Sequence, residues 1–172
     1  VDPTESVDII YTGNLGTGQA FVPFLRGFAA VDGDPELLLV GGGERRAELE
    51  ELIAELEIED QVAFAGYVDR EKIPGLLAGA DVSLVPLKTE YQLDYACPTK
   101  LLETMAVGTP YVSSKVEEIE NLTLREKTGV VTANNPNQVK ETIERLLYNE
   151  GLCDEMSNNS VEFIRSHHNW QQ

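Results

Sequence analysis

Residues 37–66, LLLVGGGERRAELEELIAELEIEDQVAFAG, contain the pattern that decides the fold of this chain. The run at 37–40 is short and wholly apolar, which is typical of a strand buried on both faces of a parallel sheet. Three glycines and a charged stretch at 44–56 follow, and this stretch predicts a helix. A second apolar run at 62–65 predicts the next strand. This strand–helix–strand order indicates a parallel α/β unit.

The same alternation extends in both directions along the chain. Together with the two strands above, the patterns predict about six strands in one α/β domain over residues 1–172. We expect a Rossmann-like, doubly wound parallel sheet with helices on both faces, whose ligand lies beyond the carboxyl ends of the strands. The further predicted strands are 7–11, 82–85, 111–113 and 129–132, and the further helices are 19–31, 71–77, 98–107, 136–148 and 151–168.

Composition narrows the class of protein. The 172 residues suffice for one sizeable core. Thirteen Lys and Arg against thirty Asp and Glu give a formal net charge of −17, which excludes nucleic-acid recognition by a basic face. No apolar run approaches the roughly 20 residues of a membrane span. Two cysteines, Cys97 and Cys153, form no disulfide or metal pattern, which favours a reducing cytoplasm.

The acidic residues are dispersed along the predicted helices and are not gathered in a tail. Two explanations stay open. One explanation is a halophilic protein, whose self-repulsion is screened by a salt-rich cytoplasm. The other explanation is an ordinary acidic surface. A halophilic protein should show a melting temperature that rises steeply with KCl concentration.

The first motif with chemical meaning is GNLGTG at 13–18, between the first predicted strand and helix. Glycines there let backbone N–H groups approach a phosphate at a helix N-terminus. The dinucleotide fingerprint is G-x-G-x-x-G with an acid near the end of the second strand. This motif is G-x-x-G-x-G, and that strand ends in Val40 and Gly41. A dehydrogenase is therefore disfavoured, and a purely structural turn remains the alternative.

The second motif is PTKLLETMAVGTP at 98–110. A helix that starts at the end of a buried strand directs free N–H groups and a positive dipole outward. Lys100 and Glu103 are three residues apart and share one face of this helix near its first turn. A diphosphate on Lys100 and a ribose on Glu103 would suit this arrangement. The alternative is an ordinary surface pair of lysine and glutamate.

Six pieces in this order resemble the C-terminal, donor-binding domain of a retaining GT-B glycosyltransferase of family 4. The GNLG and P-T-K variants resemble the subgroup that transfers acetamido sugars and deoxysugars in surface-polysaccharide assembly. The resemblance implies that the chain is one half of such an enzyme, without its N-terminal acceptor half. The pieces are IIYTGNLG at 9–16, LLLVGGGE at 37–44, VAFAGYVDREKIPGLLAGADVSLVPL at 62–87, PTKLLETMAVGTPYVSS at 98–114, TGVV at 128–131 and the helix at 136–148.

The resemblance implies a site for a nucleotide-diphosphate sugar, with UDP favoured over GDP. The ribose would lie on Glu103, the base against 66–68, and the phosphates beside the first loop. Lys100 and Glu103 are the expected catalytic residues, and no metal or cofactor is expected. The expected donor-binding residues are Gly13, Asn14, Gly16, Tyr67, Val68, Tyr95, Cys97, Thr99, Lys100 and Glu103.

The acidic pair of the family is incomplete in this chain. Members of the family carry two glutamates eight residues apart, and the upstream position is Tyr95 here, eight residues before Glu103. That upstream glutamate holds hydroxyls of the transferred sugar. Asp94 is the substitute that the sequence offers for this role.

The first loop also departs from the family. Many members carry an Arg and a Lys there that neutralise the diphosphate, whereas this chain has Asn14 and Gln19. The positive charge must then come from Lys100, or from Arg45 or Arg46 after the second strand. We favour Lys100, because a cation at a helix N-terminus is unfavourable unless an anion lies there.

The implied reaction transfers the sugar to an acceptor hydroxyl with retention and releases the nucleoside diphosphate, stabilised by helix N–H groups and Lys100. The donor-binding half alone is expected to bind nucleotide without turnover. We expect a cytoplasmic protein with no nucleic-acid partner. Membrane contact at the inner face, where the full-length enzyme makes one, would belong to the absent half.

Two other functions stay open. One is half of a nucleotide-sugar 2-epimerase of the same fold, which would need more acids and histidines in the cleft. The other is a decayed, non-catalytic nucleotide-binding module, which Tyr95 and the missing first-loop cations favour. Such a module should bind no nucleotide at millimolar concentration.

Overall fold

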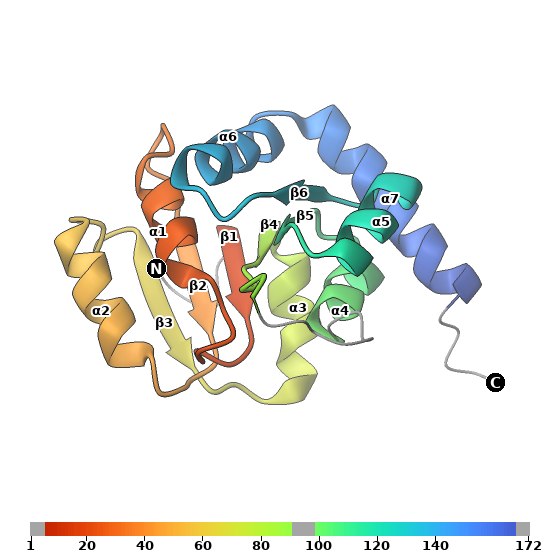
Figure 1. Cartoon of the computed structure of the whole chain (residues 1–172). Coiled ribbons are helices and arrows are strands. Elements are labelled where there is room, and N and C mark those ends of the chain that lie inside the picture. The colour runs from red at the N-terminus through yellow and green to blue at the C-terminus, as the bar shows by residue number, and fades with distance from the viewer. Residues whose placement is uncertain (1–5, 91–98, 168–172) are drawn as a thin grey trace.

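The computed structural model describes residues 6–90 and 99–167 of the chain. Six strands pair in parallel in the order β3-β2-β1-β4-β5-β6 (Figure 1). This confirms the doubly wound sheet expected from the sequence. The strands are β1 (Val7–Thr12), β2 (Leu37–Val40), β3 (Val62–Gly66), β4 (Ala80–Val85), β5 (Tyr111–Ser114) and β6 (Val130–Thr132).

The helices predicted from the sequence all occur, with small shifts at their ends. The pattern does not predict α5, because its buried residues are only Ile119 and Thr123. So narrow an apolar stripe does not show as helical periodicity. The described helices are α1 (Phe21–Ala29), α2 (Arg46–Glu55), a 3-10 turn (Arg70–Lys72), α3 (Ile73–Ala78), α4 (Thr99–Val107), α5 (Glu117–Glu126), α6 (Pro136–Leu147) and α7 (Glu150–His167).

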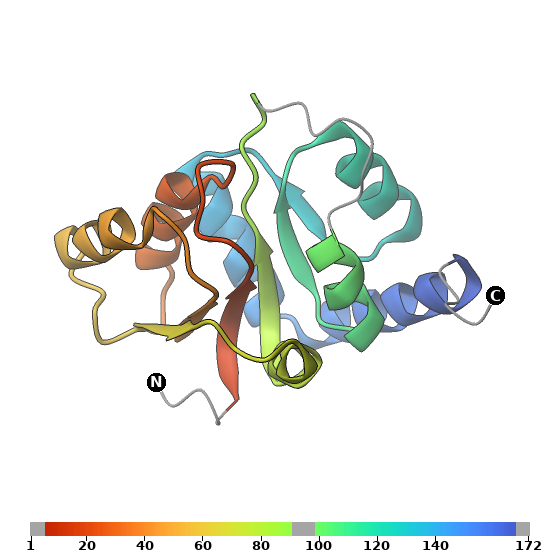
Figure 2. The same cartoon turned by 90° about the horizontal axis from the view of Figure 1, so that it is seen from below.

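Helices lie on both sides of the sheet (Figure 1, Figure 2). On one face, α1, α2 and α6 pack on the strands, and the phenylalanines of α1 (Phe21, Phe24 and Phe28) are buried there. On the other face, α3, α4 and α5 cover the strands, and α7 packs against α4. The four residues of β2 are all buried, because helices cover both faces of this strand.

Strand β1 lies between β2 and β4 in the middle of the sheet. The chain continues to one side of β1 through β2 and β3 and then returns to β4 on the other side, so the order reverses between β1 and β4. Ligands of open α/β sheets bind at such a point, outside the carboxyl ends of the strands. The loops that leave this point begin at Gly13, after β1, and at Pro86, after β4.

Candidate functional site

The loops that follow β1 and β2 are joined by backbone hydrogen bonds. The N–H of Gly13 donates to the carbonyl of Val40, and the N–H of Leu15 donates to the carbonyl of Gly42, both at 2.9 Å. A further backbone bond of 2.8 Å joins the start of the β2 loop to the last residue of β3. The three loops therefore form one connected backbone surface at the carboxyl end of the sheet.

Two glycines make this close approach possible. Gly41 has a φ of +126°, and a Cβ at this position would overlap the carbonyl oxygen of Gly13. Gly13 has a φ of +146°, and a Cβ there would lie 2.9 Å from the hydroxyl oxygen of Tyr11. Any other residue would be strained in this backbone conformation and would collide with its neighbours.

The N–H groups of the first loop differ in their partners. Every second N–H group from Gly13 to Thr17 donates within the protein, the last one to a carboxylate oxygen of Glu44 at 3.1 Å. Helix α1 then begins without a side-chain cap at Ala20. Unsatisfied donors at a loop and a helix start are the feature that binds phosphate. Within the described residues, the N–H groups of this loop without an acceptor are those of Asn14, Gly16 and Gly18.

Lys100 reaches from the first turn of α4 to the end of β1. Its Nζ lies 3.5 Å from the hydroxyl oxygen of Tyr11 and 5.1 Å from the centre of that ring. A Cβ at Gly13 would lie 3.4 Å from the same Nζ. The fold therefore brings the two motifs of the sequence, the glycine loop and the start of α4, into contact.

Burial dominates the electrostatics of this contact. It lowers the pKa of Lys100 from 10.5 to about 8 and raises the pKa of the Tyr11 hydroxyl. None of the ion pairs among the described residues includes Lys100. A buried ammonium without a counter-charge is unfavourable, and strongly perturbed groups of this kind are concentrated at functional sites.

Glu103 lies one helical turn after Lys100 on α4, and its side chain is 37% exposed. Its Oε1 is 3.8 Å from a guanidinium nitrogen of Arg70, a residue of the 3-10 turn after β3. In the described structure Glu103 pairs with Arg70 and not with Lys100. The ordinary surface pair of lysine and glutamate is therefore absent, and the carboxylate is accessible.

Tyr67 and Val68, which follow β3, have different surroundings. The Tyr67 side chain is 84% exposed. A Cβ at Gly42 would lie 2.6 Å from the Tyr67 ring, so this glycine leaves room for the ring against the loop after β2. Val68 is partly buried and packs on the apolar cluster that contains Val7. Tyr67 thus offers an open aromatic face beside the loops, whereas the Val68 side chain belongs to the packing.

Arg45 and Arg46, the other cations considered from the sequence, are already paired. The guanidinium of Arg45 makes bonds of 2.9 and 2.7 Å to the carboxylate of Glu48 and donates to the carbonyl of Gln19 at 3.0 Å. Arg46 donates to Glu50 at 3.0 Å. Both positive charges are compensated by carboxylates of α2, whereas Lys100 has no such partner among the described residues.

A hollow of about 230 Å³ opens at the start of α1, beside the glycine loop. The backbone N–H of Lys88 donates to the carbonyl of Gly18 at 2.9 Å, so the loop after β4 closes this side of the first loop. Of the polar residues of this hollow, the sequence drew attention to Gln19 and Arg45 but not to Lys88, Glu90 or Asn134. The residues that line the hollow are Gln19, Ala20, Phe21, Val22, Pro23, Arg45, Lys88, Glu90 and Asn134.

Not all of the expected site residues lie in the described part of the chain. Tyr95, Cys97 and the substitute Asp94 lie outside the described residues, and their roles stay predictions. Thr99 is the first residue of α4 and is exposed. No described helix is long and apolar enough to pass through a bilayer. Within 6–90 and 99–167, no three side chains of His, Cys, Asp or Glu are grouped as metal ligands would be.

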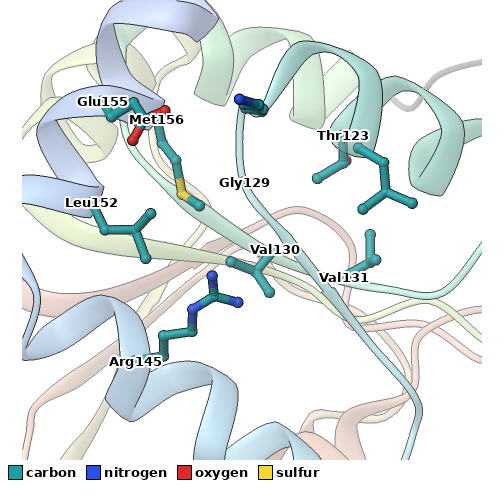
Figure 3. Close-up of a pocket in the computed structure, with 10 residues that line it drawn as sticks. Thr123, Gly129, Val130, Val131, Arg145, Leu152, Glu155 and Met156 are labelled. Carbon is teal, nitrogen blue, oxygen red and sulfur yellow. The ribbon is translucent and has the colours of Figure 1, made fainter.

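A separate pocket of about 320 Å³ lies at the start of β6 (Figure 3). In Figure 3 the Arg145 side chain extends from α6 toward Val130, and Leu152, Glu155 and Met156 come from α7. None of the expected donor-site residues lines it. The site at the carboxyl ends of the strands is thus an open surface of loops, distinct from this more enclosed pocket.

Comparison with known proteins adds a family. The chain matches the family described as glycosyl transferases group 1 over residues 2–163. A Methanocaldococcus jannaschii protein, named an uncharacterized glycosyltransferase, is 29% identical over 136 residues, which are 78% of this chain and 34% of that protein. The chain therefore spans about a third of the length of this curated relative.

Solved structures share the fold. Sucrose-phosphate synthase from Thermosynechococcus elongatus superposes with a TM-score of 0.85 at 24% identity, covering 99% of this chain and 43% of that one. Anabaena HepE in complex with UDP superposes with a TM-score of 0.81 at 18% identity, covering 95% of this chain and 45% of that one. At this level of identity the likeness establishes a common architecture.

Proposed function

Because the chain belongs to the glycosyl transferases group 1 family, we propose that it binds the nucleoside diphosphate of a sugar donor at the carboxyl end of its sheet. The observation that carries this proposal is Lys100, a partly buried amine beside Gly13 that has no carboxylate partner in the described part of the chain. A diphosphate would supply the missing negative charge through charge-assisted hydrogen bonds.

The phosphates would be held mainly by backbone donors. The N–H groups of Asn14, Gly16 and Gly18 lack acceptors in the described structure, and α1 starts beside them without a side-chain cap. The start of α4 adds its own free N–H groups and positive dipole, and the Thr99 hydroxyl lies there. Together with Lys100, these donors would replace the loop cations that other family members carry.

The nucleoside would lie toward β3. The exposed Tyr67 ring offers an aromatic face for the base, and the backbone of Val68 offers hydrogen-bonding groups beside it. The accessible Glu103 carboxylate is an acceptor suited to the ribose hydroxyls. Arg70, at 3.8 Å from Glu103, would hold this carboxylate loosely until a ribose binds.

The reaction proposed for the whole enzyme is transfer of a hexosyl or acetamidohexosyl group, with retention, to an acceptor hydroxyl. The bond between the sugar and the diphosphate breaks as the bond to the acceptor oxygen forms. Lys100 and the loop N–H groups would stabilise the charge that develops on the leaving diphosphate, without a bound metal. UDP is the nucleotide that we propose, in line with the UDP bound to HepE, and surface-polysaccharide assembly is the proposed setting.

The remaining parts of the proposal concern the rest of the enzyme. The curated relative is about three times as long as the matched region, since this region is 34% of it. We propose that an N-terminal half carries the acceptor site, so that this chain alone binds nucleotide without transferring sugar. The enzyme would act in the cytoplasm, and any contact with the inner face of the membrane would be made by that half.

The test is calorimetric titration of the chain with UDP, GDP and NAD, each at low and high KCl. Binding of UDP, weakened about 10- to 100-fold in Lys100→Ala and about 10-fold in Glu103→Ala, is expected from the loss of charged hydrogen bonds. Lys115→Ala and Glu126→Ala are matched controls, because both residues form surface ion pairs on or beside α5.

The outcomes separate the alternatives. Tighter binding of GDP than of UDP would support the proposed donor site but identify guanine as its base. Binding of NAD alone would favour a dehydrogenase, and no binding at millimolar nucleotide would favour a decayed module. Sugar transfer by the chain alone would contradict the proposed division of labour between the two halves.

A further inference from the structure

The side chain of Tyr11 is fixed in the core although its hydroxyl lies in the candidate site. The residue is 1% exposed, and its ring packs edge-on against Phe21, with ring centres 5.0 Å apart and planes at 77°. This contact holds the ring between β1 and the start of α1. The hydroxyl therefore occupies one defined position at the end of the sheet.

The two hydrogen bonds of this hydroxyl have a defined direction. Tyr11 donates its proton to the carbonyl oxygen of Asn14 at 2.7 Å. Its oxygen can then only accept from the ammonium of Lys100, whose Nζ is 3.5 Å away. One neutral side chain thus joins the glycine loop to Lys100 on α4, which is 89 residues away from Tyr11 in the sequence.

The bond to Asn14 also orients the loop. The peptide group between Asn14 and Leu15 is held at both ends, because its carbonyl accepts from Tyr11 and its N–H donates to Gly42. The flanking N–H groups of Asn14 and Gly16 are those without acceptors among the described residues. Fixing this one peptide plane therefore restrains the two neighbouring peptide groups, which carry these donors.

We propose that Tyr11 is a positioning residue, which holds the Lys100 ammonium and the N–H groups around Asn14 in the arrangement that a donor diphosphate needs. This inference rests on the function proposed above. Tyr11 itself is not placed to touch the sugar or the reacting bond. The space for the amine exists because residue 13 is glycine, where a Cβ would lie 2.9 Å from the Tyr11 hydroxyl and 3.4 Å from Nζ.

The experiment compares two buried tyrosines by calorimetric titration with UDP. Tyr11→Phe keeps the ring and removes both bonds, and a loss of affinity of about 5- to 10-fold is expected. Tyr111→Phe is the matched control, because Tyr111 is equally buried and its hydroxyl bonds Thr123 on α5 and Thr128 in the segment between α5 and β6. The control should leave the affinity within about twofold, the usual range for a distant site.

A double-mutant cycle separates positioning from a general loss of stability. If Tyr11 acts partly through Lys100, Tyr11→Phe should cost less affinity when residue 100 is already alanine. The fold-loss in the Lys100→Ala background should be at least about threefold smaller than the fold-loss in the native chain. Equal losses in the two backgrounds would overturn the proposal. An unchanged affinity in Tyr11→Phe would overturn it as well.

A second measurement needs no nucleotide. Reaction of the Lys100 amine with acetic anhydride over a range of pH, followed by mass spectrometry, reports its titration midpoint. Glu103, one turn along α4 from Lys100, and its partner Arg70 are unchanged in these variants. Removal of the hydroxyl that accepts from the ammonium should lower the midpoint below about 8 in Tyr11→Phe but not in Tyr111→Phe.

This measurement distinguishes the two failures. If Tyr11→Phe shifts the titration midpoint of Lys100 but the native chain binds no nucleotide, the proposed function is contradicted. The coupling of Tyr11 to Lys100 is still supported in that case. A midpoint that does not move in Tyr11→Phe would overturn the positioning role, whatever the chain binds.

Discussion

Two buried tyrosines of the sheet have opposite surroundings. Tyr11 lies near the end of β1 and Tyr111 opens β5, and they are 1% and 0% exposed. The Tyr111 hydroxyl bonds the hydroxyls of Thr123 and Thr128, each at 2.7 Å. It thereby joins β5 to α5 and to the segment that leads from α5 into β6. The Tyr11 hydroxyl bonds one carbonyl, that of Asn14, and otherwise faces an ammonium.

The groups around the two tyrosine hydroxyls differ in whether all of them have a partner within the protein. Around Tyr111, hydroxyl groups satisfy one another, and such a network stabilises the fold because nothing in it is left unpaired. Around Tyr11, the Lys100 ammonium has lost water without gaining a carboxylate among the described residues. A cluster of the second kind stabilises the protein less and is suited to a ligand of opposite charge.

The largest effect is expected from Lys100→Met, which keeps most of the side-chain volume. UDP affinity should fall about 30- to 100-fold, since a charge partner of the diphosphate is removed. The free energy of unfolding at pH 7 should stay equal or rise, because the variant no longer buries an unpaired cation. Titration calorimetry and urea denaturation measure the two quantities. A clear loss of stability would show that Lys100 belongs to the structural class of Tyr111.

The second effect is the reverse of the first. Tyr111→Phe should lower the free energy of unfolding by about 1–3 kcal/mol, because the two threonine hydroxyls lose a buried partner. UDP affinity should not change at temperatures where the variant is folded. The same denaturation and titration series tests it, and weaker UDP binding would erase the distinction between the two clusters.

The third effect is a pH dependence of binding. The pKa of Lys100 is lowered by burial to about 8, so the ammonium loses its proton as the pH rises from 7 to 9. UDP affinity should fall about threefold to tenfold over this range in the native chain. It should stay flat in Lys100→Met, and titrations at the two pH values in one buffer test this. A parallel fall in both chains would assign the pH effect to another group.

The same pKa predicts a change in stability with a definite sign. The native pKa of Lys100 lies below its ordinary value of 10.5, so the unfolded chain binds more protons between about 8 and 10.5. Stability should therefore rise with pH across this window relative to Lys100→Met. Paired urea denaturation curves at pH 8 and pH 10 measure the difference. An opposite slope would mean that the ammonium has a counter-charge in the folded chain.

The smallest expected difference between the two regions is in their response to salt, which should be the same for both. Screening of the net charge of −17 should raise the melting temperature with KCl. The rise should be the same in Tyr111→Phe and Lys100→Met, because the acids lie on helix surfaces. Thermal scans from low to molar KCl measure it. A steep rise favours a halophilic protein, and a flat response contradicts it.

The bounds of an element could be predicted from the sequence where its residues are completely buried. The bounds of β2 at Leu37–Val40 match the prediction because helices cover both faces and every residue must be apolar. Helix α5 escaped prediction because only Ile119 and Thr123 face inward. The site was accessible in part. Spacing singled out Lys100 and Glu103, but their separate partners, Tyr11 and Arg70, are set by contacts between distant segments.

The sequence by itself determined the alternating strands and helices, the glycine loop and the motif at the start of α4. Local periodicity and backbone requirements act between near neighbours, so a single chain displays them. Only the tertiary structure decided that Arg45 and Arg46 are neutralised by Glu48 and Glu50, while Lys100 has no carboxylate partner in the described part of the chain. It also placed Lys100 on Tyr11, 89 residues away. Desolvation and charge pairing depend on what surrounds a group in space, and no spacing along the chain encodes them.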